Sequence, residues 1–311
     1  MYDTLHIWLP GERVSNSHLL SRIPDNLSNV TEHQKADGQV FVSGMLKGTC
    51  KVNISNQGIS LKGSLAKLYL NDNFQTLTRG DAKRAFEMIE DLLHIPIQDA
   101  KVSRIDIAHN IMTDQKPEFY YPYLGDCLYY QRLIQPQSLY YNNGQRVMLF
   151  YNKIAEGKKQ KFQLPEVWQD ANVLRYELRY VSRLPKQFNM EEVNVSTLYN
   201  EKFYMGMVKR WIQQFESINK LHSINLNFEN MNSPKDFIKQ LALMKINEIG
   251  QDKTLQMVDE MKAWKAFNKP EYYCRLKADI KKLCKSPGLT SSTDLMKELD
   301  KKVKAVGKYC R

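Results

Sequence analysis

Alternation of apolar and polar residues predicts that the first half of the chain is rich in β-strands. Residues 40–48 and 49–63 alternate in this way, and the run Asn56-Gln57-Gly58 predicts a turn within the second segment. The N-terminal MYDTLHIWLP is also strand-like. Three further strands are predicted at residues 102–112, 145–153 and 173–183.

Apolar positions three or four residues apart predict helices elsewhere. One helix is expected at about 78–94, with Asp81 as its N-cap. After about residue 195 the pattern is helical, with helices expected at 196–221, from Ser233-Pro234 onward, at 270–285 and after a cap at Ser292 or Thr293. Residues 113–144 have no clear period and are predicted to form an extended loop.

Together these elements predict an α+β protein. A central, mainly antiparallel sheet with flanking helices is expected in a first domain, residues 1–190, and a basic all-helical domain in residues 191–311. Two domains agree with the length of 311 residues at about 150 residues per domain. The strands at 102–112, 145–153 and 173–183 are expected to lie in the same sheet.

The composition is that of a globular protein, with 42% hydrophobic and 25% charged residues. No apolar run approaches the ~20 residues that span a bilayer, and the N-terminus lacks the basic region of a signal peptide. The five cysteines are scattered and form no CxxC pair, which argues against a disulfide framework or a zinc ribbon. We therefore expect the protein in a reducing cytoplasm.

Basic charge is concentrated in the second half of the chain. Residues 1–150 hold 15 basic and 15 acidic residues, so 30 of the 45 basic and 19 of the 34 acidic residues follow, and these carry the whole net charge of +11. An excess of this kind favours a polyanionic partner, most commonly nucleic acid. A basic solvated surface without a partner is the alternative.

Acids within predicted strands are the unusual feature, since no P-loop, GxGxxG, HExxH or GxSxG motif is present. Asp106 lies between two isoleucines, although Asp is disfavoured in strands. Glu177 is a second acid in mid-strand. Two strand carboxylates that face one cleft can hold a divalent cation. The alternative is structural ion pairing, for instance of Asp106 with Arg104 or of Glu177 with Arg179.

Tyrosines and two neighbours of Asp106 complete the candidates. Asn110 lies on the strand face of Asp106, whereas His109 points to the other face unless a bulge intervenes. Tyr151 ends a predicted strand two residues before Lys153, so these two side chains are expected to share a face. A nearby cation or metal would favour the phenolate of a tyrosine, whose pKa is normally about 10. Ordinary strand packing is the alternative for Tyr151, and the rival candidate nucleophiles are Tyr140 and Tyr141.

Short motifs carry a resemblance to a known family. SRIDIAHN, LFYNKIAE and VLRYELRY occur in that order after the N-terminal strand segment, and GSLAKLYLNDN is similar to the family's Gly-Ser-x-x-Lys segment. Over roughly residues 1–190 the chain resembles the replication initiation proteins of the filamentous-phage gene II/X family. Its wider relatives are the plasmid replication initiators and transposon relaxases that act by rolling circle.

The resemblance implies a site-specific endonuclease that nicks one DNA strand, becomes linked to the 5′ phosphate through a tyrosine, and rejoins DNA ends. By motif, Tyr151 is the implied nucleophile with Lys153 beside it. Asp106 and Glu177 are the implied ligands of a divalent metal, Mg or Mn. The plasmid branch often has a second acid at the position of Asn110, so the third ligand is left to His109, Asn110 or water.

The implied role is initiation of rolling-circle replication in the cytoplasm of a bacterial host cell. Origin DNA, as duplex and single strand, is the implied partner, with a host helicase and polymerase acting beside it. The basic helical domain would hold phosphates, and the Tyr-rich residues 119–141 would stack bases or pack as an aromatic cluster. The alternatives are a mobilisation relaxase of a conjugative element, a non-catalytic origin-binding protein, and a metal-dependent nuclease that uses water.

Overall fold

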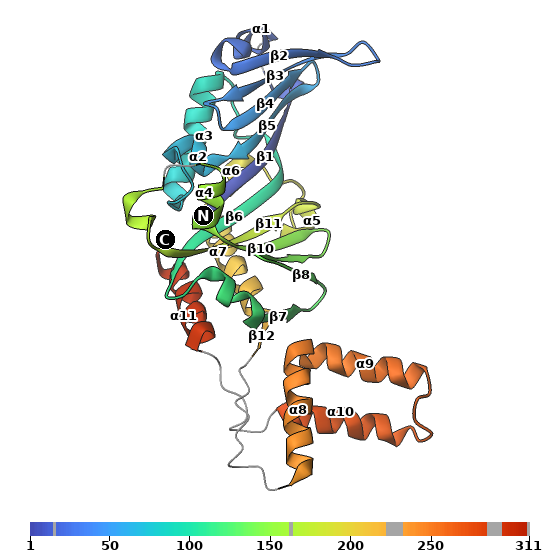
Figure 1. Cartoon of the computed structure of the whole chain (residues 1–311). Helices are drawn as coiled ribbons and strands as arrows, with labels where there is room; N and C mark the ends of the chain where they lie inside the picture. The colour runs from blue at the N-terminus through green and yellow to red at the C-terminus, as the bar shows by residue number, and fades with distance from the viewer. Residues whose placement is uncertain (15–16, 162–163, 222–232, 285–293, 310–311) are drawn as a thin grey trace.

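The computed structural model describes residues 1–14, 17–161, 164–221, 233–284 and 294–309. Its centre is a ten-stranded sheet in the order β2-β3-β4-β5-β1-β6-β11-β10-β9-β8, with every neighbouring pair antiparallel (Figure 1). The strands are β1 Tyr2–Pro10, β2 Ser28–Gln34, β3 Val40–Leu46, β4 Cys50–Ser55, β5 Gly58–Ser64, β6 Lys101–Thr113, β8 Gln131–Gln135, β9 Ser138–Asn142, β10 Arg146–Asn152 and β11 Asn172–Tyr180. The α+β prediction is confirmed, and the three strands predicted to lie together are the neighbours β6, β11 and β10.

Alternation along the strands gives the sheet one apolar and one polar face. On the apolar face the Tyr176 ring of β11 packs on Trp211, with ring centroids 4.5 Å apart. Leu5 and Leu61 line a small space together with Phe86. The helices on this face include α2 Leu65–Leu70, α3 Arg79–Leu93, α7 Glu201–Glu216 and α11 Asp294–Tyr309 (Figure 1). The polar face carries the predicted acids, as the next subsection describes.

The N-cap of α3 is Thr78 and not Asp81. The Thr78 hydroxyl accepts the Asp81 N–H at 3.1 Å, and the Asp81 carboxylate accepts the Thr78 N–H at 3.0 Å. This reciprocal arrangement satisfies two backbone N–H donors at the start of the helix. An acid at the third helical position therefore stabilises the helix start, as an acid at the N-cap would.

Residues 113–144 are not an extended loop. They form the turns η3 Pro117–Phe119 and η4 Tyr121–Tyr123 and the strands β7 Leu124–Cys127, β8 and β9, and β7 pairs with β12 Ile218–Lys220 in a second, two-stranded sheet. Buried tyrosines hold the segment: the Tyr141 hydroxyl donates to the Leu124 carbonyl at 2.8 Å, and the Tyr121 hydroxyl to that of Gln137 at 3.1 Å. Strands of four or five residues are too short to show a clear period.

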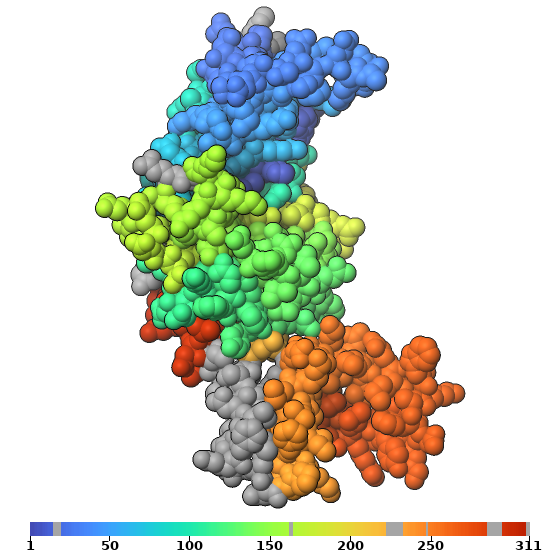
Figure 2. All heavy atoms as spheres, viewed as in Figure 1, coloured from blue at the N-terminus to red at the C-terminus, as the bar shows by residue number. Residues whose placement is uncertain are grey.

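The C-terminal helices form two packing groups. Leu299 and Val303 of α11 are fully buried in the main core, and Tyr120 donates to Glu298 of α11. A separate small core, comprising Ile246, Val258, Tyr273 and Ile280, is enclosed by α8 Pro234–Ile249, α9 Gln251–Ala263 and α10 Glu271–Cys284 (Figures 1 and 2). Helices α7 and α11, which follow residue 190 in the chain, therefore share the core of the sheet.

The remaining elements refine the helical prediction. Ser233 caps α8 as predicted, whereas Ser292 and Thr293 lie outside the described residues. The helix predicted at 196–221 is divided at Asn200, which caps α7. None of the described helices combines the length and apolar character needed to cross a bilayer. The shorter elements are α1 Ser17–Arg22, α4 Lys153–Lys159, α5 Leu184–Phe188, α6 Val195–Leu198, η1 Gly11–Arg13, η2 Ile23–Asn26 and η5 Glu166–Trp168.

Candidate active site

Three adjacent strands bring the principal predicted residues together on the polar face. Tyr151 of β10 lies opposite Arg175 of β11, and Arg179 of β11 lies opposite Asp106 of β6. Glu177 lies between the two arginines. Residues opposite each other across a strand pair share a face. Asp106 and Glu177 therefore lie on one face of neighbouring strands, which the two-carboxylate hypothesis requires.

Glu177 is the centre of this arrangement. One carboxylate oxygen, Oε1, accepts the Tyr151 hydroxyl at 2.9 Å and Nε of Arg175 at 2.8 Å. The other, Oε2, accepts Nε and Nη2 of Arg179 at 2.9 and 2.6 Å. Burial alone would raise the pKa of Glu177, but the two guanidinium groups outweigh it and lower that pKa to about 2. Glu177 is therefore ionised although it is buried.

Asp106 has similar partners but the opposite pKa shift. Its two oxygens accept Nε and Nη2 of Arg104 at 2.8 and 2.7 Å, and Nε of Arg179 lies 3.7 Å away. Burial raises the pKa of Asp106 to about 6, against the opposing effect of Arg104 and Arg179. Arg179 contacts both predicted acids and joins them into one network.

A third carboxylate, Asp3 of β1, belongs to the network and was missed by the sequence interpretation. Its Oδ2 accepts Nη2 of Arg175 at 2.7 Å, and its Oδ1 accepts the Ser64 hydroxyl at 2.6 Å. Burial lowers the pKa of Arg175, but Asp3, Tyr151 and Glu177 outweigh it and raise that pKa. The signal was available, because Asp3 is an acid in a strand-like segment.

The two neighbours of Asp106 make other contacts. His109 lies on the apolar face, as the alternation predicts, and its Nδ1 is 2.8 Å from the Thr76 hydroxyl. Burial lowers the pKa of His109 to about 4. Asn110 lies on the polar face, donates to the Asn73 carbonyl at 2.9 Å and accepts Nη1 of Arg175 at 3.1 Å. His109 therefore faces away from Asp106, and Asn110 positions Arg175.

Lys153 does not continue the strand that carries Tyr151. Strand β10 ends at Asn152, whose side chain accepts two backbone N–H groups and caps α4. Lys153 is the first residue of that helix and is fully buried. Its Nζ donates to Glu156 at 2.7 Å and lies 5.1 Å from the centre of the Phe74 ring. Strand alternation therefore does not apply to Lys153, because the strand period stops at the helix cap, and its role beside Tyr151 stays a prediction.

Tyr151 opens onto a groove of about 550 Å³ lined by β9, β10 and α4. Tyr140 and Arg179 line the same groove. Tyr141 does not, because it is fully buried and donates to backbone carbonyls. Burial raises the pKa of the Tyr151 phenol above its usual value of 10; Arg175 opposes this, and Glu177 adds to it. The hydroxyl is therefore protonated at rest and donates to Glu177.

The donor atoms do not fit a metal ion. Both oxygens of Asp106 and both oxygens of Glu177 already accept hydrogen bonds from guanidinium groups at 2.6–2.9 Å. Three arginines balance three carboxylates in this network, and a cation would have to displace them. No cluster of three or more His, Cys, Asp or Glu side chains suited to a metal occurs within the described residues. The observed state is the ion-pair alternative.

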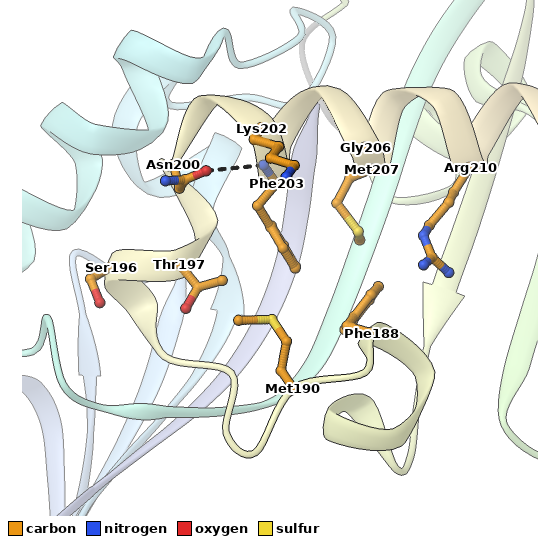
Figure 3. Close-up of a pocket in the computed structure, with 10 residues that line it drawn as sticks. All are labelled: Phe188, Met190, Ser196, Thr197, Asn200, Lys202, Phe203, Gly206, Met207 and Arg210. Atoms are coloured by element: carbon orange, nitrogen blue, oxygen red, sulfur yellow. Dashed lines mark hydrogen bonds between the residues drawn. The ribbon is translucent and has the colours of Figure 1, made fainter.

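A second cavity, of about 650 Å³, lies between α5, α6 and α7 (Figure 3). Its walls are mixed: Phe188 and Met190 lie opposite Phe203 and Met207, Arg210 lies at one end, and Thr197, Asn200 and Lys202 add polar groups. No carboxylate and no predicted site residue lines this cavity. The groove at Tyr151 is therefore the better candidate for chemistry.

Comparison with known proteins identifies a family for the chain. A phage protein family, described as the N-terminal part of a replication-associated protein, matches residues 1–211. The match covers the whole ten-stranded sheet, the arginine–carboxylate network and α7 as far as Trp211. The comparison with curated proteins finds no match. Since the matched segment is well over half of the 311 residues, the chain belongs to this family of phage replication-associated proteins.

Proposed function

We propose that the protein initiates rolling-circle DNA replication by nicking one strand at an origin and rejoining the ends, with Tyr151 as the nucleophile. The observation that carries the proposal is the Tyr151 hydroxyl, which donates to Glu177 at 2.9 Å at the edge of an open groove. Arg175 and Arg179 flank the same carboxylate. Membership of a replication-associated family supports DNA as the substrate.

In the proposed step the Tyr151 oxygen attacks the phosphorus of a phosphodiester, and the bond from phosphorus to the 3′ oxygen breaks. The 5′ phosphate is then joined to the tyrosine, and the 3′ oxygen takes up a proton to become a primer hydroxyl. The phenolic proton passes to Glu177, which returns it through solvent water to the departing 3′ oxygen and is ionised again. One phosphodiester replaces another, so a 3′ hydroxyl can reverse the reaction and reseal the strand without ATP.

The arginines supply the electrostatics of this step. A scissile phosphate held by Arg179 would draw guanidinium charge away from Glu177, and the pKa of Glu177 would rise toward that of a useful base. Arg175 would stabilise the developing phenolate. No step is assigned to the divalent metal implied by the resemblance, because the guanidinium groups occupy the oxygens it would need.

The test is attachment of the protein to DNA. Wild-type protein is incubated with supercoiled DNA that carries the origin of its replicon, and denaturing gels report a protein-linked 5′ end. Tyr151→Phe removes one oxygen and little volume, so nicking and attachment should vanish together while folding survives. Tyr140→Phe, in the same groove, is the matched control and should retain both activities.

Each other outcome identifies a competing hypothesis. Attachment by Tyr151→Phe would transfer the role to Tyr140. Nicking by the wild type without any attached protein would favour a nuclease that uses water. Origin binding without nicking would favour a non-catalytic DNA-binding protein. A mobilisation relaxase would give the same chemistry on transfer-origin DNA in place of replication-origin DNA.

A further inference from the structure

A row of basic side chains continues the polar face away from the candidate active site. Arg104 of β6 lies opposite His6 of β1. His6 lies opposite Lys62 of β5, which in turn lies opposite Lys51 of β4. Because residues opposite each other share a face, the four side chains form one line across four strands. The line starts on the strand that carries Asp106.

Lys51 and Lys62 are the unusual members of this row. Both are exposed, and neither has an acidic partner within ion-pair distance in the described parts of the chain. Like charges placed directly opposite each other destabilise a sheet. Arg104, by contrast, is paired with Asp106 at 2.7 Å. The two lysines thus form a site of positive charge that an anion would relieve.

Trp8 lies beside this row, two residues farther along β1. Its indole is half-buried and lines an open groove of about 330 Å³ together with Phe41, Lys51 and Asn53. The glycine at position 58 makes room for the ring, since a Cβ there would lie 2.9 Å from the indole Cζ2. The groove combines an aromatic surface, a cation and an amide.

We propose that the open face of β1, β4 and β5 binds single-stranded DNA, with Trp8 stacked on an unpaired base and Lys51 and Lys62 against phosphates. This inference rests on the proposed function, because it assigns the strand next to the nick a path on the protein. Aromatic side chains interleaved with basic ones are the usual composition of single-strand sites. Duplex DNA keeps its bases stacked on one another and has no free base face to offer Trp8.

The distance between Tyr151 and Trp8 along the sheet suits a DNA strand that extends from the candidate active site. Asn110 lies in the cross-strand row of Tyr151, and Lys101 lies opposite Trp8, so 110 − 101 = 9 residues of β6 separate the two rows. At about 3.4 Å per residue this is roughly 30 Å along the sheet. Several nucleotides of extended single strand would cover that span.

The first test measures stacking with the full-length protein and a fluorescently labelled oligo-dT strand, followed by anisotropy. Trp8→Ala should weaken binding about 5- to 100-fold, the effect of losing one stacked base, and Trp8→Phe should restore part of the loss. Trp264→Ala is the matched control, because the Trp264 side chain is 86% exposed and lies at the end of α9. Its affinity should equal that of the wild type.

The second test measures phosphate contacts. The double variant Lys51→Ala/Lys62→Ala should reduce the slope of log affinity against log salt concentration by about 1.4, at about 0.7 per phosphate contact on a single strand. Lys47→Ala is the control. Lys47 lies in the turn between β3 and β4, but it reaches the sulfur of Met88 on α3, on the helix-covered face. Its slope should not change.

The outcomes separate this inference from the proposed function. Trp8→Leu keeps apolar bulk but cannot stack as an aromatic ring, so wild-type affinity in this variant or in Trp8→Ala overturns the inference. An unchanged salt slope in the lysine double variant does the same. If the wild type forms the covalent adduct and these variants bind normally, only the surface is wrong. If binding depends on Trp8 but no adduct forms on any DNA, the surface stands and the proposed function fails.

Discussion

Arg179 joins the two predicted acids, yet their pKa values shift in opposite directions. The difference follows from the second partner of each acid. Glu177 is also held by Arg175, whose side chain is 3% exposed, so water weakens that attraction very little. Asp106 is held by Arg104 and Arg179, whose side chains are 26% and 27% exposed. Attraction outweighs burial at Glu177, and burial outweighs attraction at Asp106.

This difference predicts unequal effects on stability. Glu177→Gln should lower the free energy of unfolding at pH 7 by ~3–5 kcal/mol, because it leaves the three arginines of the network with two carboxylates and Arg175, which is buried, with Asp3 alone. The depressed pKa of Glu177 stabilises the fold above its unfolded value of about 4.3, and that stabilisation is lost as the pH falls toward 2. Urea denaturation at pH 7 measures the loss.

Asp106→Asn is the matched control. Its loss should be clearly smaller, because its raised pKa means that the ionised carboxylate already destabilises the fold above about pH 4, while Arg104 can turn to solvent. Equal losses for the two variants would show that the environments of the two acids do not differ as described.

Asp106 also predicts a pH dependence of DNA binding. Lowering the pH from 7 to 5 protonates Asp106, whose pKa is about 6, and removes one negative charge facing Arg104, Arg179 and Glu177. Affinity for single-stranded DNA should therefore rise across pH 6. Anisotropy titrations at several pH values measure this, and Asp106→Asn should lack that part of the rise. An equal rise in affinity in the wild type and in Asp106→Asn would show that histidines, and not Asp106, cause the pH dependence.

The sequence identified the residues of the site better than their partners. Asp106, Glu177 and Tyr151 stand out because each breaks or ends a local pattern. The pairs Asp106–Arg104 and Glu177–Arg179 lie within single strands and were open to sequence analysis. The contacts of Arg175 with Asp3 and of Arg179 with Asp106 depend on sheet register, which joins residues far apart in the chain. Two acids within strands give the same sequence pattern whether a metal ion or guanidinium groups neutralise their charge. Local sequence therefore could not decide between a metal site and the ion pairs that the structure shows.

At the scale of elements, the long periodic segments were predicted well and the junctions were not. Strands β6 and β11 and helix α3 have clear periods and lie where expected. The helix predicted at 196–221 is broken by the cap at Asn200, and β10 stops at the cap of α4. A cap needs only one polar side chain, so it leaves little trace in an average over a window.

Helix α11 predicts how the C-terminal part contributes to stability. Leu299→Ala removes a fully buried side chain from the core shared with the sheet and should cost ~2–5 kcal/mol in the main unfolding transition. Ile280→Ala truncates a buried side chain in the small core of α8–α10 and should leave the main unfolding transition unchanged. Thermal unfolding followed by near-UV circular dichroism distinguishes them. A single transition shifted by both variants would mean that the two cores unfold together.

For the whole molecule, the helices α8–α10 are an insertion between β12 and α11. Strand β12 ends at Lys220, Leu221 still donates to the Tyr123 carbonyl, and α11 begins at Asp294. The inserted helices, residues 233–284, hold 11 basic and 7 acidic residues, a net charge of +4. Their own core and their charge suit an accessory surface that holds duplex phosphates while the sheet face holds the single strand.

Replacing residues 222–293 with a short Gly-Ser linker tests this division. The main unit should remain folded, because α7 and α11 are kept, whereas truncation after residue 195 would remove both from its core. Affinity for duplex DNA should fall and its salt dependence should weaken. Binding to oligo-dT should persist. Gel-shift titrations over a range of salt concentrations measure both, and unchanged duplex affinity would exclude the inserted helices as the docking surface.

The place of β1 in the sheet has a consequence during synthesis. It is synthesised before both of its neighbours in the sheet, β5 and β6, and β6 begins only at Lys101. At 5–20 residues per second, one edge of β1 waits about 5–20 s for its partner. Until then the nascent chain exposes an unpaired strand edge, the kind of surface that chaperones protect. Pairing of β1 with β6 joins the two halves of the sheet across a long sequence separation. We therefore expect the formation of this strand pair to limit the folding rate.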